Sequence, residues 1–72
     1  MQATFNLAAI TKYSDGNSGV RLEFEPPVTP VKADADFWAG TPTGRCEVYV
    51  NPTQAIGFQP GQTFVIQFVQ IG

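Results

Sequence analysis

The segment VRLEFE at residues 20–25 decides the fold class of this chain. Apolar side chains at the even positions alternate with charged side chains at the odd positions. This two-residue period is typical of a β-strand, because successive side chains of a strand point to opposite faces of a sheet. The segment therefore predicts a strand with one face in an apolar core and the other face in water.

Three further segments predict strands. They are residues 3–12, 45–51 and 63–71. In the first of them the alternation breaks around Ala8, which predicts a β-bulge or burial on both sides. The last segment is apolar on both faces, which predicts a central strand or one that closes a barrel. The terminal residues of that segment are also suited to pairing with a partner chain.

Glycine and proline mark the connections between these strands. Asp15-Gly16 favours a hairpin turn, because glycine tolerates the positive φ that such turns need. Pro26 and Pro27 lack the N–H that strand pairing requires, so the chain is expected to leave the sheet there. Residues 31–37 alternate again, as a weak strand or as an extended loop packed by one side, and their small alanines favour the loop.

These elements predict a single domain over residues 1–72, built as a small five-stranded all-β barrel. A short helical turn is expected before the last strand, since Asn51 can cap it and Pro52 suits the first helical position. A turn in that place favours a Src-homology-like barrel, and an oligonucleotide-binding-like barrel is the alternative. Closure suits this weakly charged chain, because a closed barrel has no exposed sheet edge.

The composition limits the chemistry of the chain. Six acidic residues against four basic ones give a net charge of −2 and a pI near 4.6, which disfavours a surface for nucleic-acid phosphates. Histidine is absent, and the single cysteine, Cys46, excludes an intrachain disulfide and a structural zinc site. No segment resembles a signal peptide or reaches the ~20 apolar residues that span a bilayer. We therefore expect no cofactor and no membrane association.

No arrangement of residues predicts catalysis. Cys46 shares the phase of Val48 and Val50, so we expect an inert core thiol. Asp34 and Asp36 would fall on one side of an extended segment, yet calcium takes ~6–8 oxygen ligands and no calcium loop is present. We expect these two carboxylates to lie on a solvated face. The sequence thus predicts no catalytic residue and no metal ligand, and we expect no enzyme.

Exposed aromatic and apolar side chains are the candidates for binding. Phe37 and Trp38 lie in a loop-like stretch, and the two tyrosines fall on a turn and on an outward strand position. Such rings anchor protein partners or stack on single-stranded bases, although Trp38 is equally suited to cap one end of the barrel. Val69 and Ile71 are placed to extend a sheet of a partner. The predicted partner-binding residues are Phe37, Trp38, Tyr49, Tyr13, Val69 and Ile71.

Four turn motifs in this chain are similar to motifs of a known group of proteins. They are Lys-Tyr-Ser-Asp-Gly at 12–16, Phe-x-x-x-Thr-Pro-x-Gly at 37–44, Asn-Pro at 51–52 and Phe-x-Pro-Gly-x-x-Phe at 58–64. With them the chain resembles small phage-encoded all-β proteins of uncharacterised function, over most of its length. The resemblance implies a phage origin and brings no active site with it.

In a phage context we expect a structural role. The first hypothesis is a virion-associated decoration or cement protein, which binds a larger phage structural protein or associates with itself. The alternative is a small barrel that binds single-stranded nucleic acid, which the acidic charge disfavours. A third is an accessory protein that redirects a host factor by strand addition. The expected location is the virion or the host cytoplasm.

Overall fold

The computed structural model describes residues 1–13, 19–29 and 31–72. These ranges form four β-strands and two short 3-10 turns, and they contain no α-helix. The elements are β1 (Gln2–Lys12), β2 (Val20–Glu25), η1 (Lys32–Asp34), β3 (Cys46–Val50), η2 (Pro52–Ala55) and β4 (Thr63–Gln67). None of the helical turns in these ranges is long and apolar enough to cross a membrane. The predicted all-β class is confirmed.

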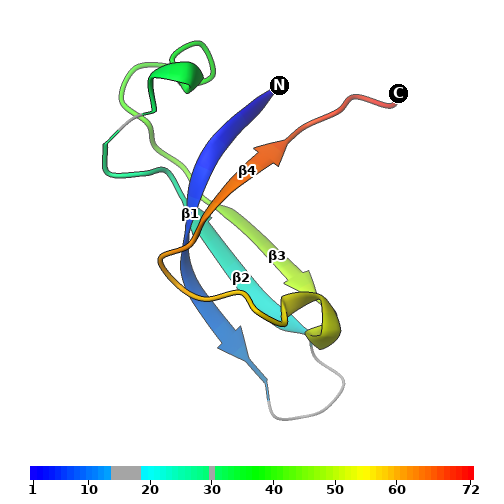
Figure 1. Cartoon of the computed structure of the whole chain (residues 1–72). Coiled ribbons are helices and arrows are strands. Elements are labelled where there is room, and N and C mark those ends of the chain that lie inside the picture. The colour runs from blue at the N-terminus through cyan, green and yellow to red at the C-terminus, as the bar shows by residue number, and fades with distance from the viewer. Residues whose placement is uncertain (14–18, 30) are drawn as a thin grey trace.

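The four strands form one antiparallel sheet in the order β3-β2-β1-β4, which curves into a half-barrel (Figure 1). The strand predicted over 20–25 coincides with β2. Residues 31–37 contain η1 where a fifth strand was considered, so closure by five strands is not confirmed. β3 and β4 are the two edges of this sheet, because each pairs as a strand only with its inner neighbour among the described residues.

The core lies on the inner face of the half-barrel. Its buried residues come from alternate positions of the two central strands, as the alternation of β2 predicts. They are Ala3, Phe5 and Leu7 of β1 with Val20, Leu22 and Phe24 of β2. Half-buried rings complete this core: Phe64 of β4 packs edge-on against Phe24 at 5.5 Å and stacks on Phe58 at 4.8 Å. The inner-face side chains of β1 and β2 are therefore the most deeply buried, and those of the edge strands are only partly buried.

A β-bulge in β1 changes which side chains face the core. The pairing with β2 shifts between Leu7 and Ala9, which confirms the irregularity predicted around Ala8. Beyond the bulge Ile10 pairs with Leu22, whose side chain lies in the core. Directly paired residues share a face of the sheet, so the bulge puts Ile10 on the inner face.

The prolines after β2 send the chain out of the sheet, as predicted. β2 ends at Glu25, opposite Asn6, and the chain then runs to η1. The backbone N–H of Thr4 lies beyond the end of β2, and the Asp34 Oδ2 atom accepts its hydrogen bond at 2.7 Å. The prediction of a solvated face was wrong for Asp34, which is only 9% exposed, because this carboxylate replaces the missing strand partner. Asp36 is exposed.

The predicted helical turn before the last strand is confirmed. Asn51 precedes η2 and its Oδ1 atom accepts hydrogen bonds from the N–H and hydroxyl of Thr53, while Pro52 occupies the first position. The last strand differs from its prediction. β4 covers Thr63–Gln67 and lies at an edge, so it neither closes a barrel nor sits centrally. The predicted Asp15-Gly16 turn falls outside the described residues.

Candidate interaction surface

The structure separates the six predicted binding residues into two groups. Phe37 and Trp38 follow η1, and Val69 and Ile71 follow β4. Figure 1 shows η1 and both chain termini at the same end of the sheet. Tyr13 directly follows β1, and Tyr49 is the next-to-last residue of β3. Both strands finish at the opposite end of the sheet (Figure 1). The six predicted residues therefore belong to two separate surfaces of the molecule.

The first group is tied to the core by aromatic contacts. Trp38 packs against Phe5, with ring centroids 5.5 Å apart, and against Phe37 at 4.8 Å. Phe37 in turn stacks on Phe68, just beyond β4, at 6.3 Å and 20°. Phe37 and Trp38 are both half-buried and packed against the core, and we call these two rings the aromatic cap. The contact of Phe68 with Phe37 places the segment after β4 next to the aromatic cap.

Backbone hydrogen bonds define the free edge of β4. Met1 and Phe68 exchange both of their N–H to carbonyl bonds, at 3.1 and 2.7 Å. In an antiparallel pair such exchanges alternate along the strand, so Ile66 and Phe64 also point their backbone groups at β1. Val65 and Gln67 therefore direct their N–H and C=O groups away from the sheet. These groups form an edge to which another strand can add.

The side chains along this edge are apolar and uncharged. Val65 of β4 is 61% exposed, and beyond the strand Val69 is 69% and Ile71 is 98% exposed. Residues 51–72 contain no Asp, Glu, Lys or Arg. Soluble proteins usually protect a sheet edge with charged residues, proline or a covering segment. We call residues 63–71 the β4 edge; it lacks charges along its whole length.

The second group lies on the outer face of the sheet. The rings of Tyr13 and Tyr49 stack at 6.4 Å and 25°, and the Tyr49 hydroxyl donates to Glu47 at 3.4 Å. Arg21 donates to Glu47 at 2.9 Å and also forms an ion pair with Glu23. The hydrogen bond with Arg21 lowers the pKa of Glu47, and interaction with Tyr13 raises the pKa of Tyr49. Two carboxylates thus neutralise the guanidinium beside these rings.

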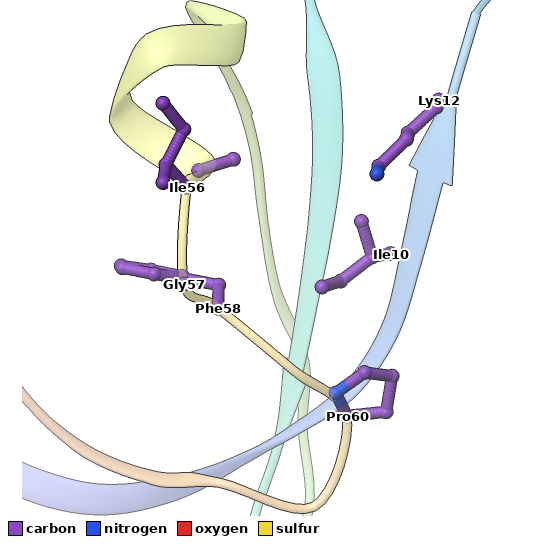
Figure 2. Close-up of a pocket in the computed structure, with 7 residues that line it drawn as sticks. Ile10, Lys12, Ile56, Gly57, Phe58 and Pro60 are labelled. Carbon is purple, nitrogen blue, oxygen red and sulfur yellow. The ribbon is translucent and has the colours of Figure 1, made fainter.

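A groove that sequence reasoning missed lies between β1 and the segment after η2. Figure 2 shows Ile10 and Lys12 of β1 on one side of it and Ile56 and Phe58 on the other. Its volume is about 690 Å³, and most of its lining is apolar, with the Lys12 ammonium at one side. The bulge at Ala8 creates this face, because it brings Ile10 round to the inner side.

Cys46 and Asp34, which the sequence analysis considered for catalysis and metal binding, take part in packing and hydrogen bonding within the fold. Cys46 pairs with Phe24 and is half-buried against the core, as its phase predicts. The Asp34 carboxylate is engaged by the Thr4 N–H. Within residues 1–13, 19–29 and 31–72, no three His, Cys, Asp or Glu side chains gather as they would around a metal ion.

Comparison of the chain with models of known protein families, with curated proteins and with solved structures finds no match.

Val69 and Ile71, which the sequence predicts as partner-binding residues, lie just beyond β4 and are exposed. The sequence predicts a central or closing position for the last strand, so it does not place Val65 among the candidates. The signal that could have found the β4 edge is the absence of charge after Asn51. An enclosed strand and an edge strand can both be apolar, and only the number of strands that pair with β4 distinguishes them; in the part of the chain that the structure describes, β4 pairs with β1 alone.

Proposed function

We propose that this chain is a non-enzymatic interaction protein of a phage particle, which binds a larger structural protein through the β4 edge. The observation that carries the proposal is the unprotected edge itself. Over the ranges that the structure describes, no second strand pairs with the outward backbone groups of Val65 and Gln67, and the apolar side chains of Val65, Val69 and Ile71 stand beside them in solvent.

Strand addition is the binding mode that fits such an edge. Backbone hydrogen bonds supply the attachment, and alternate side chains supply the specificity. Because residues 51–72 are uncharged, the matching partner segment is an extended apolar strand rather than an acidic or basic one. That strand would also supply the fifth strand of the predicted barrel. One such contact is weak, but a particle presents many copies and gains from multivalency.

The aromatic cap supports the same partner. Phe37 contacts Phe68, so a protein seated along residues 63–71 also reaches Phe37 and Trp38. Half-buried aromatic rings beside an apolar strand are the kind of residues that dominate protein interfaces. The surface of the proposed contact thus combines the β4 edge with these two rings.

Quantitative mass spectrometry of purified particles of the phage that encodes the chain tests the proposal. We expect a fixed ratio of this chain to a major structural protein. Add-back of purified chain to particles that lack it should restore that ratio. The Val65→Lys variant should fail in the add-back, whereas Val28→Lys, which changes a loop valine that is 99% exposed, should bind like the original chain. Particles without the chain would overturn the proposal.

A second candidate function, binding of single-stranded nucleic acid, is favoured by one observation. Tyr13 and Tyr49 are 41% and 62% exposed and stack in parallel on the outer face. Aromatic platforms of this kind bind bases at ~1–3 kcal/mol each. A fluorescence-anisotropy titration with a labelled oligonucleotide at low salt tests it. Binding that is lost in Tyr13→Ala with Tyr49→Ala would support this function, and a flat curve for the original chain would exclude it.

A further inference from the structure

We infer that β4 pairs antiparallel with β4 of a second copy of this chain, around a twofold axis at Gln67. The inference rests on the β4 edge of the proposed function and names the chain itself as an occupant of that edge. The second copy protects the edge while the chain is free of its larger partner.

The backbone of β4 is arranged for such a pair. Gln67 and Val65 direct their N–H and C=O groups away from β1, since the Met1–Phe68 exchange sets the alternation along the strand. Two antiparallel copies related by a twofold axis can exchange hydrogen bonds at Gln67 itself and, once residues 68–71 extend β4, at every second residue on either side. The sheet of one molecule then continues into the sheet of the other.

The side chains select this register. An axis at Gln67 places Val65 opposite Val69 of the second copy and Ile66 opposite Phe68. Each of these pairs occurs twice, so apolar side chains meet on both faces of the joined sheet. Moving the axis to Val65 keeps the hydrogen-bonding alternation but sets Thr63 opposite Gln67 and loses the Val65–Val69 pairs. The register around Gln67 therefore pairs more apolar side chains than the register around Val65 does.

Charge distinguishes the two edges of the sheet. β3, the other edge, carries Glu47 on its outer face and follows directly after Arg45. Charged side chains on an edge discourage strand pairing because pairing brings them together and removes water from them. The β4 edge carries no charge that would repel a second copy, and burial of the matched apolar side chains favours the pair.

Analytical ultracentrifugation of the full chain over a range of concentrations tests the inference. We expect a monomer–dimer equilibrium for the original chain. Val65→Lys puts an ammonium into the Val65–Val69 pair and should weaken the association by about tenfold or more. Val28→Lys makes the same chemical change in an exposed loop and should leave the dimer unchanged. Circular dichroism and the urea midpoint check that both variants fold as the original chain does.

A charge-pair variant tests the register itself. Val65→Lys and Val69→Glu, each alone, should weaken the dimer, and the two together in one chain should restore it. In the proposed register each new lysine lies opposite a glutamate of the other copy. A chain that stays monomeric at all concentrations would overturn the inference, as would a dimer insensitive to Val65→Lys or without rescue by the pair. A monomer that still binds particles through Val65 would overturn the dimer and leave the proposed function standing.

Discussion

The carboxylate of Asp34 takes the place of a strand next to Thr4. Its Oδ2 atom accepts the Thr4 N–H at 2.7 Å, although the two residues are thirty positions apart. β2 ends opposite Asn6 and the prolines that follow cannot continue the ladder, so the Thr4 N–H would otherwise have no strand partner in this part of the sheet. The turn η1 thereby holds the loop, and with it Phe37 and Trp38, against the start of β1.

Replacement of Asp34 tests this arrangement. Asp34→Ala removes the acceptor and should lower the free energy of unfolding by about 1–3 kcal/mol, because a part-buried N–H is left without its partner. Asp34→Asn keeps a carbonyl oxygen and should lose less. The urea midpoint measures stability, and hydrogen exchange at the Thr4 amide reports the bond directly. An unchanged Thr4 exchange rate in Asp34→Ala would contradict the role given to this carboxylate.

Truncation of Leu22 should destabilise the fold severely. The side chain is 2% exposed and lies in the core between β1 and β3. Leu22→Ala should cost about 2–5 kcal/mol, through lost burial and the cavity left behind. A loss of that size approaches the whole stability of so small a domain. Chemical denaturation checks this, with Val28→Ala at a 99% exposed site as the control. Equal midpoints for the two variants would mean that the inner face is assigned incorrectly.

Gly19 should tolerate no side chain. A Cβ atom at this position would meet the carbonyl oxygen of Val50, at the point where β2 begins to pair with β3. The obstacle is backbone, which cannot turn aside as a flexible side chain can, so Gly19→Ala should cost about 1–3 kcal/mol. Thermal or urea unfolding measures the effect. Gly72→Ala is the matched control, since a Cβ there meets nothing within 4 Å and should leave the unfolding midpoint unchanged.

Removal of the Tyr13 hydroxyl should lower the pKa of Tyr49. Interaction with Tyr13 is the largest cause that raises this pKa, ahead of burial and the charge of Glu47. Tyr13→Phe leaves a single tyrosine, so its phenolate absorbance titrates Tyr49 alone. In the original chain, NMR of the tyrosine rings separates the two groups. A Tyr49 pKa that is the same in both chains would contradict the contact.

The sign of the associated stability follows from the direction of this shift. A raised pKa means that the fold favours the neutral phenol. The contribution of Tyr49 to the free energy of unfolding is therefore fully present below the ordinary tyrosine pKa of about 10. It is lost as the pH rises through the higher pKa of Tyr49 in the folded chain. Because Tyr49 is largely exposed, the contribution is small and screened by water. The titration itself, rather than a melting curve, is the sensitive measurement.

Much of the local structure could be predicted from short patterns. The period of residues 20–25 placed β2 and its inner face, and Asn51-Pro52 placed η2. These features depend on neighbours within a few positions: alternation along a strand, and a side chain that caps the next turn. The irregularity around Ala8 was also visible, though the pattern could not show that it would turn Ile10 toward a groove.

The partners of each strand were decided by the tertiary structure alone. An apolar segment such as residues 63–71 is compatible both with the interior of a barrel and with an exposed edge. Its sequence pattern indicates which faces of the strand are apolar, but it does not indicate which strands lie beside it. Asp34 shows the same limit, since a lone carboxylate in an alternating segment reads as solvated until a distant N–H needs an acceptor. By itself the sequence determined β2 with its inner face and the approximate positions of β1, β3 and β4. Only pairing across the chain decided that β4 would remain an edge, because hydrogen-bond partners in a sheet are distant in sequence.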